Sequence, residues 1–432
     1  MMANPVATET SLFLGHYAQD PKARQDLLDF LRARPEVEQV SSLLPLHEYD
    51  MRLGIITQIR DVLRAGNGPR DFQLTHIQFC YLIRMPQVEL NRALQMATLS
   101  GITFKATLSH LGMLTEHFLQ KAGFDDQTTA KGSNTSISSL VKKTRNQGQA
   151  DKCKDLDGGV CIVTGATDPE ACHIIPFAWN NSLHNMAKTS RLQPAMDLFL
   201  GLPRATVDDT LLTNDSLGRL CSAPGSSDYT WNMLCLSPLL HVWWSRAYFG
   251  FKFLGATPIL EDPEPSTSKP SPPKSSVKLQ LVWMPRNIQS SLAKTHIMLE
   301  QEQGPNKRLP ALVTHHHGGS LATCFTPGCG TCFEVNKVRA HNVKTNRPVW
   351  TGSIFNVTRF TTEVPLFQRM IEVQWAIICA AALSGRAQDP DLFLRRDEDD
   401  PAQASHMAEE DVLEWMQGVQ PPSGEHLEEP TT

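Results

Sequence analysis

Two short blocks of the sequence carry side chains whose types and order suit hydrolysis. The first block, residues 172–177, reads Cys-His-Ile-Ile-Pro-Phe. Its two isoleucines favour a pleated backbone, and Pro176 cannot continue a ladder because it lacks an N–H group. The block is therefore expected to be a short strand that presents His173 near its end.

The second block, residues 231–241, predicts a short apolar strand followed by a helix. Ser237 is a suitable N-cap, and Pro238 suits the first helical turn, where a missing N–H costs nothing. Asn232 stands before or at the start of the strand, and His241 falls within the first two turns of the helix. The expected order is His on a strand, Asn on a second strand or its turn, and His on a helix.

This order of residues suits the hydrolysis of a phosphodiester. The reaction needs a base that activates water, a group that orients the base, and a cation beside the scissile phosphate. We expect His173 to be the base, because a neutral imidazole has a pKa near neutrality. Asn232 is expected to orient the base or the substrate, and His241 to ligate a divalent metal ion that stabilises charge on the phosphate oxygens.

On these residues the chain resembles the HNH nucleases, and most closely the type found in filamentous fungi. In that type the first His is followed by Ile-x-Pro, and the second block reads roughly Asn-x-x-x-Leu-Ser…His. The match extends to residues 161–165 upstream and 248–252 downstream. The resemblance implies an α+β fold, with a ββα-metal (HNH) finger embedded in a mainly α-helical chain. It also implies a metal-dependent endonuclease that cleaves nucleic acid, with DNA the favoured substrate.

At two positions the chain lacks an acidic residue that many HNH proteins have at or near the metal site. Many HNH proteins have an acidic residue directly before the first His, whereas this chain has Cys172, which we expect to be a buried packing residue. Relatives often carry an Asp near the position of Ser245. His241 is then the main candidate ligand, with waters, the substrate phosphate and Asn232 as the others, and the ion stays open among Mg²⁺, Mn²⁺, Ni²⁺ and Zn²⁺. A second interpretation therefore stands beside the first: a catalytically decayed HNH-fold protein that serves as a nucleic-acid-binding or protein-interaction module.

Cysteine positions bear on a possible zinc site. Only Cys161 occupies a place where many HNH proteins carry paired cysteines, so no structural zinc is expected in the finger. Further along, Cys324, Cys329 and Cys332, with His341 nearby, have the residue types of a tetrahedral zinc site, although their glycine-rich context also fits an ordinary loop. A third interpretation, an unrelated zinc-binding regulatory protein, depends on that cluster.

Composition indicates a globular chain with a polar end. Of the 432 residues, 41% are hydrophobic and 20% charged, which suits two or three domains. Residues 389–432 hold thirteen acidic residues and two arginines, and removing their −11 from the net charge of −5 leaves +6 for the rest. A mildly basic body suits a polyanionic partner, although many other proteins carry such a charge.

The chain shows no expected secretory or membrane segment. Its N-terminus has no basic region before an apolar run, and the most apolar stretch, residues 375–383, is too short to span a membrane. We therefore expect reduced cysteines, no membrane partner, and an intracellular location, cytoplasmic or nuclear.

The patterns divide the chain into seven segments, and an insertion between the two motif blocks is expected to shape or cover the substrate groove. Arg246 and Lys252 are candidates for contacts with a phosphate backbone, or simply solvated side chains. A strand is expected at residues 161–164. The predicted segments are a disordered N-terminus (1–21), a helical domain (22–122), a linker (123–150), an HNH nuclease-like domain (151–260) with its insertion (178–230), a Pro/Ser-rich loop (261–276), a strand and helix that complete the core (277–388) and an acidic disordered tail (389–432).

Overall fold

The computed structural model describes most of the folded chain, in eight stretches. These are residues 36–65, 72–119, 144–200, 222–260, 272–285, 295–304, 307–318 and 340–388, with a few single residues before position 36. Several predicted features lie outside the described residues: most of the N-terminus, most of the linker, residues 261–271 of the Pro/Ser-rich loop, the cluster of Cys324, Cys329 and Cys332, and the acidic tail.

The first described part of the chain is helical, as its apolar periodicity predicts. Four helices follow one another: α3 (Tyr49–Ala65), α4 (His76–Arg84), α5 (Gln87–Leu99) and α6 (Gly101–Phe118). Each buries an apolar face, and α4 begins with a capping box in which Thr75 and Gln78 satisfy each other's backbone N–H groups. A single hydrophobic core continues from these helices into the strands described below.

The two motif blocks form an antiparallel hairpin and a helix. Strand β1 (Glu170–His173) pairs with β2 (Met233–Leu236), and His173 lies opposite Met233. Helix α11 (Pro238–Ser245) follows directly, with Ser237 at its N-cap and Pro238 in its first turn. The predicted strand–strand–helix order is confirmed, with His173 at the end of β1.

The strand predicted at residues 161–164 was wrong, because these residues form a turn. The N–H of Gly165 donates to the carbonyl of Cys161 at 2.8 Å, and the N–H of Thr164 lies 3.4 Å from the Cys161 sulfur. Gly165 has a φ of 71°, a left-handed conformation that glycine accepts readily. The apolar residues between them favour a strand locally, but the closed turn satisfies their backbone groups instead.

A second, three-stranded antiparallel sheet lies beside the hairpin. Its order is β3 (Phe249–Pro258), β4 (Lys274–Trp283) and β5 (Ile354–Phe360). The alternating sequence before Met284 correctly predicts β4, but the strand begins earlier than expected. Residues 274–276, assigned to the Pro/Ser-rich loop, already pair with β5, and residues 275 and 276 also pair with β3.

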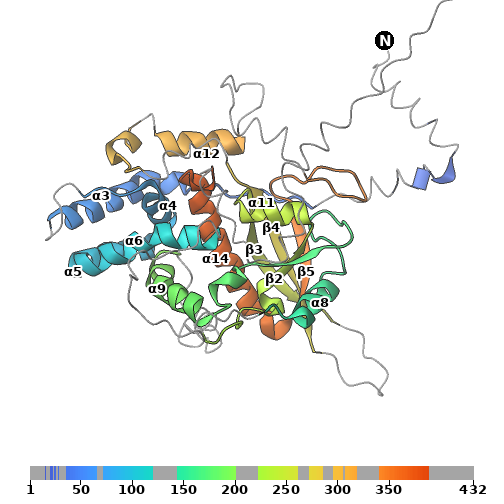
Figure 1. The fold of residues 1–432 in the computed structure, drawn as a ribbon. Coiled ribbons are helices and arrows are strands. Elements are labelled where there is room, and N and C mark those ends of the chain that lie inside the picture. The colour runs from blue at the N-terminus through green and yellow to red at the C-terminus, as the bar shows by residue number, and fades with distance from the viewer. Residues whose placement is uncertain are drawn as a thin grey trace, which may run out of the picture.

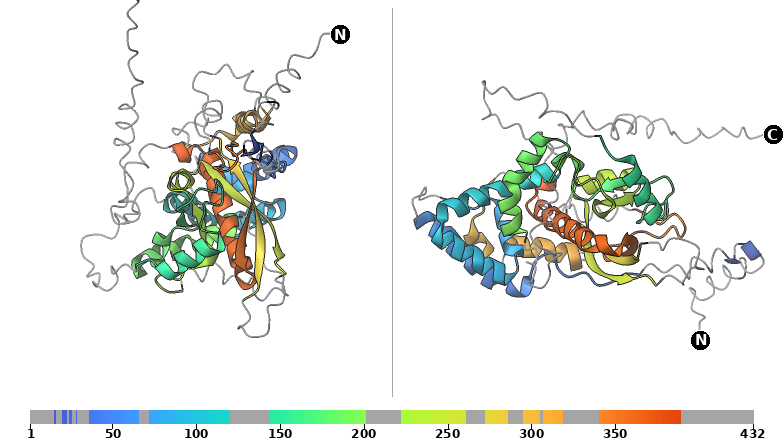
Figure 2. Two further views of the ribbon diagram at one scale, coloured as in Figure 1. Left: turned by 90° about the vertical axis from the view of Figure 1, so that its right-hand side faces the viewer. Right: turned by 90° about the horizontal axis from the view of Figure 1, so that it is seen from below.

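Helix α14 (Val364–Leu383) joins the two halves of the molecule. It runs between the helices α3–α6 and the strands (Figures 1 and 2), and it packs on β3 while also contacting α4 and α6. The side chain of Gln374 accepts a hydrogen bond from the N–H of Phe251 at 3.0 Å. The helix extends well beyond the apolar stretch seen in the sequence and is long and apolar enough to cross a membrane, yet 72% of its most apolar window is buried in the protein.

The described part of the insertion packs against the helical region. Helix α9 (Leu183–Phe199) lies on α6, where the rings of Phe104 and Phe199 meet edge to face at 5.6 Å. This part of the insertion therefore connects the hairpin to the helices. Within the described stretches, the remaining helices are α8 (Gln147–Leu156) and α12 (Arg308–Gly318), and the short 3₁₀ turns are η1 (Leu46–Glu48), η2 (Phe177–Trp179), η3 (Thr230–Asn232), η5 (Leu299–Glu302), η7 (Thr361–Glu363) and η8 (Arg386–Gln388).

A fully buried ion pair links α8, the hairpin and the second sheet. Asp157, at the end of α8, and Arg359, in β5, have side chains that are 0% exposed and meet at 2.6 Å. Arg359 also donates to the carbonyl of Met233 in β2 at 2.6 Å. The other oxygen of Asp157 accepts the N–H of Cys235 at 2.9 Å. Both charges are thus paired and hydrogen-bonded, as burial requires.

Replacing Arg359 by Met is expected to destabilise the fold by about 3–5 kcal/mol, because it leaves the Asp157 carboxylate buried without a countercharge. Urea unfolding followed by circular dichroism measures the change. The matched control is Arg92→Met, which removes a partly exposed ion pair with Glu89 and should cost about 0–1 kcal/mol. Equal free energies of unfolding for the two variants would contradict the stabilising role of the Asp157–Arg359 pair.

Candidate active site

The ring of His173 is held by a carboxylate that comes from elsewhere in the chain. Its Nε2 atom lies 2.9 Å from Oδ1 of Asp228, and both side chains are only 5% exposed. The second oxygen of Asp228 accepts the backbone N–H of Asn146, just before α8. An ionised carboxylate can only accept hydrogen bonds, so Nε2 must carry the proton and Nδ1 of the neutral ring keeps its lone pair.

The surroundings of His173 favour the neutral ring. Burial lowers the pKa of His173, and the nearby Arg145 acts in the same direction, while Asp228 opposes both. The ring also stacks on Phe177, with centroids 5.4 Å apart. A neutral, oriented imidazole is the form that a general base requires at neutral pH.

Sequence reasoning missed Asp228, although it lies inside the predicted insertion. The segment that carries it is held by a second buried network: the Asn180 carbonyl accepts the N–H of Gly225 at 2.8 Å, and the Asn180 side chain accepts the hydroxyl of Ser227 at 2.6 Å. Asp228 is 55 residues from His173. No local pattern marks it, because the contact depends on how the chain returns to β2.

Asn232 positions backbone and does not contact the His173 ring. Its side-chain oxygen accepts the N–H of Ile175 at 2.9 Å, and its nitrogen donates to the carbonyls of Ile175 and Ser227 at 2.9 and 3.1 Å. Asn232 is 0% exposed. Asp228 contacts the ring, whereas Asn232 fixes the backbone of Ile175 and Ser227, next to His173 and Asp228. The expected role of Asn232 in orienting the base or the substrate stays a prediction.

His241 meets two further side chains from β1. Its Nδ1 lies 2.7 Å from Oε2 of Glu170, and ligand atoms of Glu170, Cys172 and His241 all lie within 4.8 Å of one another. Glu170 was missed in the sequence, although its position two residues before Cys172 places both on one face of a strand. Cys172, expected to be a packing residue, is buried but belongs to this cluster.

The charge on His241 follows from the same contacts. Burial opposes protonation of the ring, but the contacts with Cys172 and Glu170 outweigh it and raise the pKa of His241 to about 10. Without a bound cation, this cluster is therefore an imidazolium paired with a carboxylate. A divalent cation would take the place of that proton.

The donor set of this second cluster fits a divalent metal ion. A carboxylate, a thiol and an imidazole are common ligands of borderline ions such as Zn²⁺, whereas Mg²⁺ prefers oxygen ligands alone. Glu170 and His241 remain partly exposed, at 29% and 23% of their side chains, so solvent reaches the ligands.

The two histidines project to different sides of β1. Side chains alternate along a strand, so His173 shares a face with Ala171 while Cys172 shares one with Glu170. Contacts agree with this: Ala171 packs against Met233 and Cys235, on the side away from His241. The two groups are nevertheless near one another, because the charge on His241 is among the causes that lower the pKa of His173.

The two basic candidates lie on different elements. Lys252, in β3, donates to the hydroxyl of Ser41 at 2.8 Å, and Arg246 is the C-cap residue of α11. The phosphate contacts suggested for them remain predictions.

Comparison with known proteins identifies the region that contains both clusters. Residues 161–252 match the family model described as HNH endonuclease, so this part of the chain is an HNH endonuclease domain. No protein of curated function and no solved structure matches the chain significantly. The family match confirms the resemblance and the fold class: an HNH domain within a mainly helical α+β chain.

Replacing Asn232 by Ala is expected to destabilise the protein, because it leaves buried backbone groups of Ile175 and Ser227 unpaired. Each such group costs roughly 1–3 kcal/mol. Thermal unfolding of the variant measures the loss, with Asn185→Ala, a half-buried residue on α9, as the control. Wild-type stability of Asn232→Ala would contradict the structural role of Asn232.

Proposed function

We propose that the HNH domain at residues 161–252 is a metal-dependent endonuclease that hydrolyses phosphodiester bonds of DNA. One observation carries this proposal: the hairpin that presents the His173–Asp228 pair also gathers Glu170, Cys172 and His241 within ligand distance of one another. A base and a set of metal ligands on one short ribbon are the two parts that the reaction needs.

His173 accepts the proton of the attacking water at Nδ1. Asp228 accepts the hydrogen bond from Nε2 and so keeps the ring in the tautomer whose Nδ1 is free to take a proton. When Nδ1 is protonated, the carboxylate stabilises the imidazolium that forms. Asp228 is therefore a positioning residue, and Asn146 and Asn232 hold the backbone around it.

Glu170, Cys172 and His241 are the residues that would hold the ion. A divalent cation bound there supplies positive charge that stabilises the phosphate oxygens. The imidazole of His241 and the thiol of Cys172 favour a borderline ion, and Glu170 adds the negative charge that the residue directly before His173 does not supply.

The scissile phosphate lies at the end of β1, where both sides of the strand can be reached. Arg145 supports this placement, because its guanidinium lies 6.0 Å from the Phe177 ring that stacks on His173. Lys152 and Lys154 follow on α8. Such cations attract the phosphate backbone of either nucleic acid, and the basic body of the chain strengthens that attraction at low salt.

One observation favours a second function, nucleic-acid binding without cleavage. The His173 side chain is only 5% exposed, and its ring is enclosed by Phe177 and Asp228. A base that water cannot reach would leave a domain that binds nucleic acid through its charged surface. The two tests below separate this function from hydrolysis.

Replacing Asp228 by Asn should lower the rate of plasmid nicking by roughly 10²–10⁴-fold. The amide can donate to Nε2 and thereby shift the proton to Nδ1, which then cannot accept another. Single-turnover nicking assays measure the rate, and filter binding should show unchanged DNA affinity. His173→Ala should lose a similar factor.

The matched control for Asp228 is Asp155→Asn, an exposed carboxylate on α8. It removes the same charge from the surface and should nick at the wild-type rate. Wild-type nicking by Asp228→Asn would remove the pair from the mechanism.

Nicking should appear with Mn²⁺ or Ni²⁺, be weaker with Mg²⁺ and stop with a chelator, because the donor set suits borderline ions. His241→Ala should abolish it. His47→Ala provides the control, since its side chain is 82% exposed and lies in the helical region. DNA binding without strand breaks under every ion, in the wild type as well as the variants, would support the binding function instead.

A further inference from the structure

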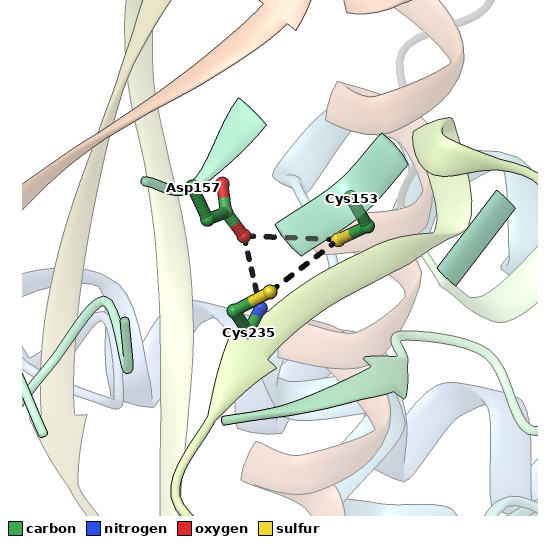
Figure 3. Close-up of side chains that lie close together, drawn as sticks. All are labelled: Cys153, Asp157 and Cys235. Atoms are coloured by element: carbon green, nitrogen blue, oxygen red, sulfur yellow. Dashed lines mark hydrogen bonds between the residues drawn. The ribbon is translucent and has the colours of Figure 1, made fainter. Parts of the chain in front are cut away.

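Behind the hairpin lies a second cluster of ligand-type side chains that the proposed reaction does not use. Cys153 and Asp157 lie four residues apart at the end of α8, and Cys235 lies in the middle of β2. Figure 3 shows the three side chains pointing toward one another, and both cysteines are fully buried. Ligand atoms of all three lie within 4.8 Å of one another.

The separations in this cluster are those of a tetrahedral zinc site. Two zinc–sulfur bonds of about 2.3 Å at a tetrahedral angle hold their sulfurs about 3.8 Å apart, and a zinc–oxygen bond of about 2.0 Å puts oxygen about 3.5 Å from sulfur. The sulfurs of Cys153 and Cys235 are 3.8 Å apart, and the Cys153 sulfur is 3.7 Å from Oδ2 of Asp157. These two separations are close to those of a zinc site, and all three ligand atoms lie within 4.8 Å of one another.

A disulfide fits the same atoms less well. Its two sulfurs must approach to about 2.05 Å, so the observed separation would have to close by roughly 1.8 Å. Because Cys153 is fixed on a helix and Cys235 on a paired strand, such a shift would move one element against the other. The cluster is thus arranged for an ion between the sulfurs rather than for a bond.

Arg359 balances the charge of the site. Its short contact is with Oδ1 of Asp157 at 2.6 Å, while its second nitrogen lies 3.4 Å from Oδ2, the oxygen that faces the Cys153 sulfur. Two thiolates, one carboxylate and one guanidinium carry a net charge of −2, which a divalent cation neutralises. A site buried this deeply needs such neutrality, because an uncompensated charge there is costly.

We propose that Cys153, Asp157 and Cys235 form a structural site for a thiophilic divalent cation of the zinc class, which fastens α8 to β2. The ion binds as each thiol releases its proton to solvent, and no oxidant or reductant takes part. The three side chains supply three of the four positions of a tetrahedral site. The site lies on the opposite side of the hairpin from His241, so it is separate from the ion of the proposed reaction.

The test measures bound zinc in the full chain, purified under reducing conditions from cells grown with added zinc. The background carries Cys324→Ser, Cys329→Ser and Cys332→Ser, which removes the other group of cysteines, and His241→Ala, which removes a ligand of the proposed active-site ion. One zinc per chain should remain after dialysis, and X-ray absorption should show two sulfur neighbours for it. Cys153→Ser and Cys235→Ser should each lose that zinc and unfold at a lower temperature.

Two matched controls separate this site from other thiols. Cys80→Ser alters an equally buried cysteine in α4, and Cys172→Ser alters the cluster around His241; both should keep the zinc that has two sulfur neighbours. Because the readout is metal content and coordination, failure of DNA cleavage leaves the result unaffected.

The X-ray absorption measurement needs neither cysteine variant, so it decides the matter even where Cys153→Ser or Cys235→Ser fails to fold. The proposal is overturned if X-ray absorption of the background protein detects no zinc with two sulfur neighbours. So would a Cys153–Cys235 disulfide found by mass spectrometry after thiol alkylation.

Discussion

A ribbon of only two four-residue strands cannot hold its own shape in water, and the rest of the structure compensates for this weakness. Isolated two-stranded hairpins are marginal because each strand has one hydrogen-bonding neighbour and too little apolar surface. Here side chains from outside the ribbon bond its backbone. Arg359 reaches the carbonyl of Met233, Asp157 the N–H of Cys235, and Asn232 both groups of Ile175. The chemistry of the site depends on these supports, because they determine where β1 ends and therefore where His173 stands.

The two histidines illustrate how one residue type is adapted to two tasks by its carboxylate partner. His173 faces a carboxylate that is almost fully buried, and burial keeps its ring neutral. His241 faces Glu170, which is partly exposed and lies beside a thiol, and its ring is protonated until a cation replaces the proton. Neither carboxylate lies within the two motif blocks. Side chains outside the motif therefore determine that His173 suits the role of base and His241 that of metal ligand.

How much the sequence could predict follows from the range of each signal. The strand ending at His173 and the helix beginning after Ser237 were predictable, because proline, β-branched residues and caps act within a few positions. Ile162 and Val163 misled for the same reason, since their local preference for a strand yields to the turn closed by Gly165. Asp228 and Arg359 were not predictable, because their partners lie 55 and 202 residues away and only the folded chain brings them together. Glu170 was predictable, because side chains two residues apart on a strand share a face and Glu170 lies two residues before Cys172.

The supports of the ribbon begin before the matched family region and end after it. Asn146, Cys153 and Asp157 precede residue 161, and Arg359 follows residue 252 by more than a hundred positions. The residues that match the family model are therefore fewer than the residues that hold the hairpin in its folded shape. The hairpin cannot be moved to another protein by itself. A fusion or domain exchange at the boundaries of the family match would transfer its reactive side chains without the residues that hold them in position.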